Sequence, residues 1–303
     1  MRTPAEISYG SFAFDEMRPC LDAMTEIARE GVTSECFGFD PVLQSMRMRR
    51  ESLMKDVKTF ANVVTGQTSI AKGIVEGAKM ALAGRGFMDD VKFSFHLTCE
   101  DRTAAGAEER LNFCRATVKK FGGREIENTI PKAIRAYPFT PLNNMLGPAG
   151  ERWLPVHGLF PASDVANVID ATAKLFDGFK DEIAAHNIEI GYMFAVVGNN
   201  AFVYEPVFYW PDQWMPVQRR VPEQAHLAKL KESPANAAAS AAVHKIKTAL
   251  CKHFAVHGAA HFQVAKAYQY KAHRDPAAWA LLEKLKSAVD PKRLVNPASL
   301  GLE

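Results

Sequence analysis

The sequence predicts an α+β fold in which helices pack on an antiparallel sheet. Three observations lead to this expectation. β-α-β patterns recur along the chain, two consecutive strands near residue 200 are joined by a tight turn, and the composition changes after residue 221. A hairpin joins antiparallel neighbours, whereas strict β-α alternation would indicate a parallel sheet. The Ala-, Lys- and His-rich stretch over 222–289 predicts a helical C-terminal subdomain beside that sheet.

The first β-α-β unit begins near the N-terminus. Residues 8–14 are predicted as a strand, and Asp15 is the expected N-cap of a helix over 15–30. An apolar stripe runs along this helix, and Gly31 is expected to end it. Residues 32–39 then return as a strand, and a mostly helical insertion is expected over about 41–86.

The second unit starts with a strand at 91–97, where apolar and polar residues alternate with period two. A helix follows over 104–121, and the pair Gly122-Gly123 is expected to end it. Residues 125–129 are predicted to return as a further strand.

The third unit contains the hairpin. We expect a strand at 153–160, a helix at 162–186 and strands at 188–197 and 202–209. The residues 198–200, Gly-Asn-Asn, form the turn between the last two strands.

Composition excludes several classes of protein. The 303 residues are 48% hydrophobic and 23% charged, which is typical of a soluble protein with a substantial core. A formal charge of +3 does not favour a nucleic-acid surface. No apolar run approaches the roughly 18 residues of a membrane span, and the first residues resemble neither a signal nor a transit peptide. Five scattered cysteines indicate reduced thiols and a cytoplasmic location.

Two groups of residues are candidates for a site on chemical grounds. His253, His257 and His261 recur every four residues, so one helix face would carry three imidazoles that bind zinc or simply titrate or pack. Aromatic residues crowd 188–210, where Tyr204, Glu205, Tyr209 and Trp210 either belong to the core or line a pocket. No Walker A, G-x-G-x-x-G or G-x-S-x-G motif is present.

The C-terminal residues resemble a known family. The segment 279–286, followed by Asp290-Pro291 and Asn296-Pro297, is similar to the ending of the FAD-linked oxidases. That family includes vanillyl-alcohol oxidase, 4-cresol dehydrogenase, glycolate oxidase and D-lactate dehydrogenase, and typically closes with L-K-x-x-L-D-P-x-x-x-x-N-P-G. Ala298 stands at the position of the final Gly. Residues 256–260 resemble the E-H-G-x-G segment of the family, and 153–163 resemble the beginning of its substrate domain.

The resemblance implies a two-part flavoprotein with FAD as its cofactor. This chain would be the C-terminal part, with a ferredoxin-like cap or substrate domain over 1–221 and the helical subdomain over 222–303. The implied partner is an FAD-binding domain, encoded in the same gene or as a separate chain, and self-association of the cap is left open. The implied reaction passes a hydride from an alcohol, hydroxy acid or benzylic or phenolic substrate to flavin N5. Alone, the cap is expected to be inactive.

The resemblance also assigns residues to the site. His257 would be the general base at the flavin edge, a role that suits an imidazole near neutral pH. Asn296 would contact the cofactor together with His257. Substrate contacts would come from Asn200, Tyr204, Tyr209 and His261.

Metal ligands are not expected. Aligned on the hairpin, Ala195, Phe202 and Val256 occupy the positions of the metal ligands in hydroxy-acid dehydrogenases of the family, and none of the three can coordinate a cation. This favours the branch that oxidises aromatic alcohols and phenols. The alternative function is a non-catalytic ferredoxin-like binding or scaffold module.

Overall fold

The computed structural model describes residues 4–49, 91–136, 139, 141–261, 263, 266–268, 270–271 and 274–302. The predicted helical insertion begins as α2 (Pro41–Arg49), and the rest of that prediction lies outside the described residues.

Within the described residues, eight strands form one sheet in the order β4-β1-β3-β2-β7-β8-β5, and β6 also pairs with β8. Every pairing is antiparallel, which confirms the predicted sheet. The strands are β1 (Glu6–Phe14), β2 (Glu35–Phe39), β3 (Phe93–Asp101), β4 (Arg124–Glu125), β5 (Arg152–Pro155), β6 (Gly158–Pro161), β7 (Glu189–Val197) and β8 (Ala201–Trp210).

The strand predicted at 125–129 is mostly wrong. β4 has only two residues, residues 126–128 are irregular, and α6 (Thr129–Ala136) begins at Thr129. Pro131 lies in the first turn of α6, where its fixed φ favours a helix and its missing N–H has no partner to lose. The single strand predicted at 153–160 is divided into β5 and β6, but both pair with β8 in one continuous register.

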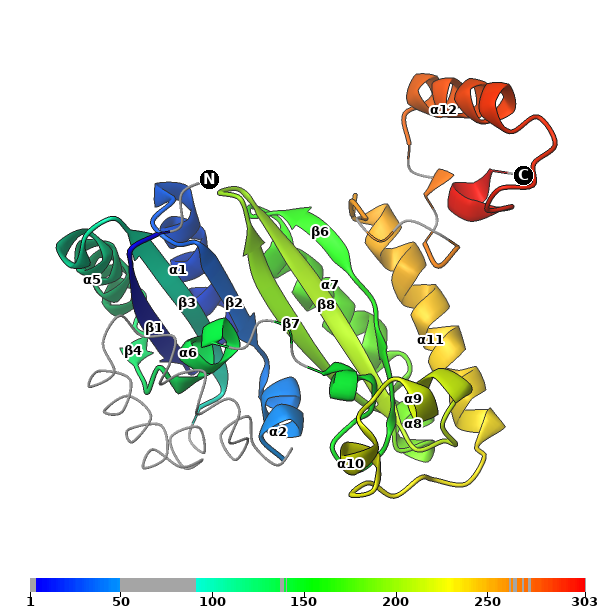
Figure 1. Cartoon of the computed structure of the whole chain (residues 1–303), viewed down its shortest axis with the longest axis horizontal. Coiled ribbons are helices and arrows are strands. Elements are labelled where there is room, and N and C mark those ends of the chain that lie inside the picture. The colour runs from blue at the N-terminus through cyan, green and yellow to red at the C-terminus, as the bar shows by residue number, and fades with distance from the viewer. Residues whose placement is uncertain are drawn as a thin grey trace.

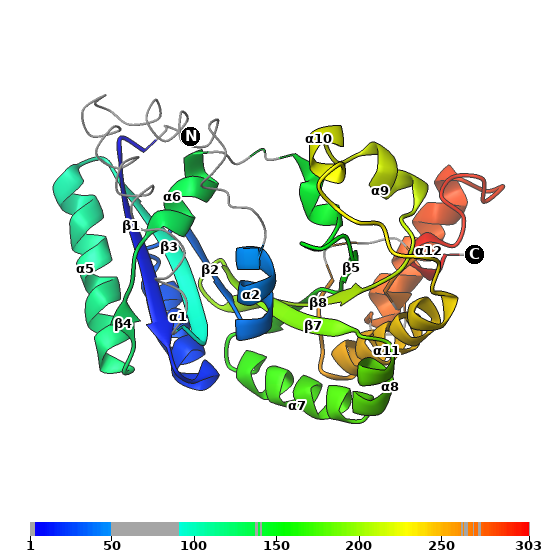
Figure 2. The same cartoon turned by 90° about the horizontal axis from the view of Figure 1, so that it is seen from below.

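Four long helices cover one face of the sheet: α1 (Met17–Glu30), α5 (Ala104–Lys120), α7 (Val165–Asp177) and α11 (Ala237–Val256) (Figures 1 and 2). The short α8 (Lys180–Ala185) follows α7. α1 buries Leu21, Met24 and Ile27 at helical spacing, and Gly31 ends it with a φ of 63°. Its N-cap is Glu16 rather than the predicted Asp15, and no side chain caps the helix.

Shorter elements lie on the opposite face, which we call the open face (Figure 2). They are α2, α6, η2 (Leu142–Met145), α9 (Pro216–Arg220) and α10 (Gln224–Leu227). The prediction of helices on one face only is therefore incomplete. α2 packs Leu43 against Phe39, Val207 and Tyr209 and so covers the half of the open face away from the β7–β8 hairpin.

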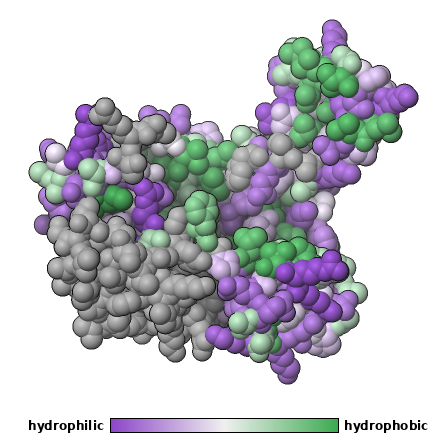
Figure 3. Space-filling view, viewed as in Figure 1, coloured by the Kyte–Doolittle hydropathy of each residue, from purple (hydrophilic) through white to green (hydrophobic). Residues whose placement is uncertain are grey.

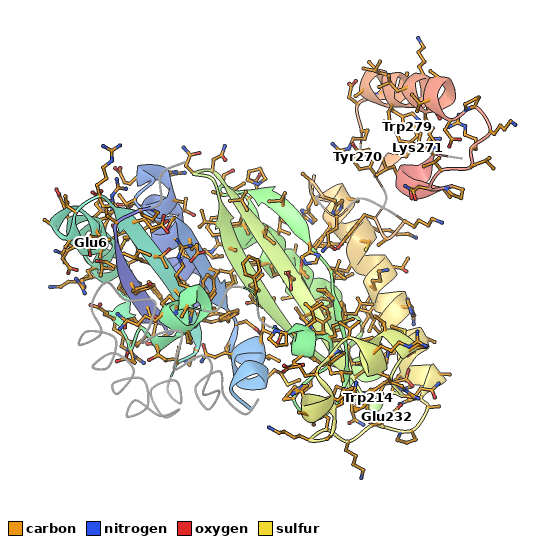
Figure 4. All side chains as sticks on the ribbon, viewed as in Figure 1. Glu6, Trp214, Glu232, Tyr270, Lys271 and Trp279 are labelled. Atoms are coloured by element: carbon orange, nitrogen blue, oxygen red, sulfur yellow. The ribbon has the colours of Figure 1, made fainter. Side chains whose placement is uncertain are left out.

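The stretch over 222–289 is less helical than predicted. Gly258, with a φ of 73°, turns the chain away after α11, and the next α-helix among the described residues is α12 (Pro276–Val289). Side chains of α11 belong to the main core, so the boundary predicted at 221 does not separate two cores. α12 and η4 (Ser299–Gly301) form a projecting C-terminal lobe (Figure 1). In that lobe Lys271 lies over the ring of Trp279, 5.1 Å from its centroid (Figure 4).

The five cysteines are buried free thiols, as their spacing predicts. Among the described helices, none combines the length and the hydropathy that a membrane span requires.

Candidate functional site

A row of apolar side chains crosses the uncovered half of the open face. Phe37 of β2 pairs with Ala195 of β7, Ala195 with Val203 of β8, and Val203 with Leu159 of β6. Because strand residues alternate between faces, these four point to the same side, and each is half-buried. We call them the apolar platform. Figure 3 views this side of the molecule, where apolar surface gathers over the middle of the sheet.

A buried pair of polar side chains borders the platform on the side toward α2. Glu205 of β8 lies opposite His157 at the β5–β6 junction, and Glu205 Oε2 is 2.7 Å from His157 Nε2. The two side chains are only 11% and 9% exposed. A carboxylate at this depth needs such a partner, because burial without one is costly.

Tyr268 completes the edge of the platform. Its hydroxyl oxygen accepts the backbone N–H of His157 at 2.9 Å and lies 3.2 Å from His157 Nδ1. Burial raises the pKa of Tyr268, and the N–H of His157 opposes that increase.

His261 holds Tyr268 from the other side. The two rings stack with centroids 4.2 Å apart, and His261 Nδ1 is 3.0 Å from the carbonyl oxygen of His157. Ala260, next to His261, pairs with Leu159 and continues the sheet beyond β6. We call Glu205, His157, Tyr268 and His261 the edge cluster.

The structure places one of the sequence-predicted site residues, His261, in this cluster. Tyr204 and Tyr209 both lie on β8 but point to opposite faces. Tyr204 is 1% exposed and packs against Tyr192 and Phe254 on the helix side. Tyr209 is buried beneath α2.

The other three predicted residues lie on separate, exposed segments. Asn200 is in the β7–β8 turn, where its carbonyl oxygen accepts the N–H of Ala162. His257 follows the last turn of α11. Asn296 is in the closing loop of the C-terminal lobe, well removed from the hairpin (Figure 1). Their convergence stays a prediction.

The histidine series does not share one helix face. α11 ends at Val256, so His261 leaves the helix and faces His157, while His253 and His257 remain neighbours with centroids 4.4 Å apart. Among the described residues, no group of three or more His, Cys, Asp or Glu side chains is placed to hold a metal ion.

The structure shows which way the hairpin positions aligned with metal ligands point. Ala195 faces the open side, but Phe202 faces the helices, and the open-face neighbour of Ala195 is Val203. In this register Ala195 and Phe202 cannot point into one site, and the alignment itself stays a prediction. Valine coordinates a cation no better than phenylalanine does.

Sequence reasoning missed His157 and Tyr268 as functional residues and treated Glu205 only as a member of an aromatic segment. The available signal was one polar residue inside each of two apolar strands, at 157 and 205. Their pairing depends on the β6–β8 register, which alternation alone does not supply.

Comparisons with known proteins agree with this architecture. The sequence matches the family "FAD linked oxidases, C-terminal domain" over residues 3–300. Comparison with curated protein sequences found no match.

Similar solved structures include p-cresol methylhydroxylase with substrate bound, with a TM-score of 0.58, 13% identity, and coverage of 100% of this chain and 54% of that one. A 4-ethylphenol oxidase from Gulosibacter chungangensis, in complex with isoeugenol, has a TM-score of 0.53 and 14% identity, covering 100% of this chain and 55% of the other. An alkyldihydroxyacetonephosphate synthase has a TM-score of 0.52 and 12% identity, covering 97% and 44%.

At these identities the solved structures establish the fold alone, and the chain spans about half the length of each of them. The family match, in contrast, covers nearly the whole chain. This protein therefore belongs to the FAD-linked oxidases, has the C-terminal domain of that family, and has FAD as its cofactor.

Proposed function

We propose that this chain is the substrate-binding cap of an FAD-dependent oxidoreductase that oxidises an alcohol, a hydroxy acid or a benzylic or phenolic carbon. The observation that carries the proposal is the apolar platform with the buried Glu205–His157 pair and the Tyr268 hydroxyl at its edge. Binding sites for flat organic molecules are mostly apolar and have a few fixed polar groups.

The platform residues fit a flat ring system. Ala195 and Val203 are short, so a ring can approach the strands closely, and Phe37 and Leu159 extend the apolar surface on either side. These four side chains would hold the ring system of the cofactor or the substrate. When bound, FAD supplies the acceptor for a hydride.

The chain's own residues orient the substrate and hold protons. The edge cluster contains one carboxylate, Glu205, and no Arg or Lys. A substrate carboxylate is usually held by a fixed guanidinium or ammonium group. The cluster therefore favours a neutral alcohol or phenol over a hydroxy acid.

We infer an FAD-binding domain as the partner, in the same gene or as a separate chain. The similar solved structures are about twice as long as this chain, which supports a second part of comparable size. α12 carries Leu281, Leu285 and Val289 on one face, and these are 60%, 54% and 80% exposed (Figure 3). Leu294 and Val295 in the closing loop are also exposed, by 74% and 61%. An exposed apolar stripe of this length is typical of an interaction surface.

We also infer a ferredoxin-like topology for the N-terminal half. The order β1-α1-β2 followed by β3-α5-β4, with the sheet order β4-β1-β3-β2, supports this inference.

The test is co-expression with the FAD-binding domain, followed by measurement of flavin reduction by candidate aromatic alcohols. Val203→Trp fills the platform and is expected to slow reduction by about a hundredfold, because small misplacements of a reacting group cost that much. Lys252→Trp, on the exposed side of α11, is the matched control and should leave the rate of flavin reduction unchanged. Equal rates in the two variants would contradict the site. A wild-type complex that binds substrate without reducing flavin would favour the non-catalytic module.

A further inference from the structure

We infer that Tyr268, His157 and Glu205 form a proton relay in which the Tyr268 hydroxyl exchanges a proton with the substrate. This inference rests on the proposed function, because it assigns a catalytic residue to the same site. It starts from three heavy-atom distances: 2.7 Å from Glu205 to Nε2, 3.2 Å from Nδ1 to the Tyr268 oxygen, and 2.9 Å from that oxygen to the backbone nitrogen of His157.

The tautomer of His157 follows from its contact with Glu205. An ionised carboxylate only accepts hydrogen bonds, so Nε2, at 2.7 Å from Glu205, carries the hydrogen. In a neutral imidazole Nδ1 then carries the lone pair that accepts a hydrogen bond. That lone pair faces the hydroxyl of Tyr268.

The direction of the Tyr268 O–H follows from the contact of its oxygen with the backbone of His157. The backbone N–H of His157 already donates to the Tyr268 oxygen. The hydroxyl hydrogen is therefore available for Nδ1, and the sequence of bonds is Tyr268 O–H to Nδ1 and Nε2–H to Glu205. This is the arrangement of a hydroxyl, an imidazole and an orienting carboxylate that serine hydrolases use, with a phenol in place of the serine.

In the proton-transfer step, the substrate O–H bond breaks and a new O–H bond forms on Tyr268. The original tyrosine proton passes to Nδ1, which forms an N–H bond. The substrate oxygen is left with a negative charge and His157 with a positive one, and no electron is transferred. Glu205 stabilises the imidazolium. When a hydride then leaves the substrate carbon, the substrate becomes neutral, and release of the His157 proton to solvent restores the neutral imidazole.

Burial explains why Tyr268 needs this partner. Because burial raises the pKa of its hydroxyl, the isolated phenol does not ionise near neutral pH. A coupled transfer to His157 avoids a free tyrosinate, while the backbone N–H of His157 stabilises the charge that develops on the oxygen. His157 and Glu205 are positioning residues, and His261 fixes the plane of the Tyr268 ring by stacking.

Nitrogen NMR of this chain without flavin tests the relay independently of turnover. We expect Nε2 of His157 to be protonated and Nδ1 to accept a hydrogen bond. Tyr268→Phe should shift the Nδ1 resonance toward that of a free imidazole nitrogen and leave Nε2 protonated. Glu205→Gln should weaken the preference for this tautomer. A protonated Nδ1 in the wild-type chain would overturn the relay.

Flavin reduction in the two-part enzyme gives the second measurement. Tyr268→Phe is expected to lower the rate by about 10²–10⁴-fold with little change in KM, the range for a lost general acid or base. Tyr270→Phe, in the C-terminal lobe, is the matched control. A normal rate in Tyr268→Phe together with a slow Val203→Trp would overturn the relay and leave the platform in place. If the wild-type enzyme reduces no flavin, the proposed function fails, and the NMR result still decides the geometry.

Discussion

The two faces of β7 and β8 are built from alternate residues of the same strands, yet they differ in kind. Toward the helices the strands present Phe194, Phe202, Tyr204 and Phe208, all at most 1% exposed. Toward the open side they present Met193, Ala195, Val203 and Glu205. The aromatic enrichment of this segment therefore marks the core. The candidate site lies among the small and polar residues that alternate with these aromatic residues and face the open side.

The open face itself has a covered part and an uncovered part. Beside Phe37 and Phe39, on the neighbouring strand β3, Nδ1 of the buried His96 is 2.8 Å from Ser11 Oγ. Ser94 of the same strand donates a hydrogen bond to Gln44 of α2. This network fastens α2 to the sheet. The polar groups of the edge cluster lie instead beside the half-buried platform.

The largest expected effect compares the two faces of β8. Phe208→Ala should lower the free energy of unfolding by about 3–5 kcal/mol, because it leaves a cavity in the core next to Phe176. Val203→Ala on the half-buried platform should cost about 1 kcal/mol. Chemical denaturation of both variants measures the difference. Equal losses would show that the open face contributes as much to stability as the core does.

The next prediction tests the covered network through the titration of His96, one of its members. Burial lowers the pKa of His96 from 6.5 to about 3. The unfolded chain therefore binds more protons between these values, and stability should fall as the pH drops through this window. The loss is on the order of 4 kcal/mol.

His96→Asn removes the titrating ring and should flatten this part of the profile of unfolding free energy against pH. An unchanged slope in His96→Asn would mean that another group controls acid unfolding.

Titration of Asp40 should change the free energy of unfolding in the direction opposite to that of His96. It joins β2 to β7 by accepting the N–H groups of Leu43 and Tyr192, and burial raises its pKa from 3.8 to about 6. The folded state binds more protons between these values, so stability should fall as the pH rises through the window, by on the order of 2 kcal/mol.

Asp40→Asn keeps the acceptor oxygen without the charge. Measured against this variant at each pH, the wild-type chain should lose stability from about pH 4 to pH 6. A parallel profile for the two proteins would contradict the assignment.

The smallest effect concerns the C-terminal lobe, which lies outside the main sheet. Leu285→Ser replaces an exposed leucine, so the free energy of unfolding should change by less than about 0.5 kcal/mol. Binding to the FAD-binding domain should weaken measurably in titration calorimetry, and Lys284→Ser provides the matched control. Self-association that disappears in Leu285→Ser, with unchanged binding to that domain, would show that a second copy covers the stripe.

The sequence by itself determined the elements and the family. Alternation identified the strand at 91–97, and the Gly-Asn-Asn turn separated the strands at 188–197 and 202–209. The apolar stripe and Gly31 bounded α1, and the closing D-P-x-x-x-x-N-P segment indicated the FAD-linked oxidases. These signals are local, because helix and strand periods are properties of neighbouring residues. The strand predicted at 125–129 was mostly wrong, since β4 ends at Glu125, residues 126–128 are irregular and Thr129 begins α6.

Only the tertiary structure decided which residues meet. Tyr204 was expected in the site and lies in the core, whereas His157, 48 positions before Glu205 in the chain, lies directly across from it. Tyr268 reaches the same point from the connection after α11. The physical reason is register: a shift of one residue between two strands moves every side chain to the other face, and no local pattern fixes that choice. The turn at Gly258, which directs His261 away from the helix and toward His157, is equally a matter of how α11 packs on the sheet.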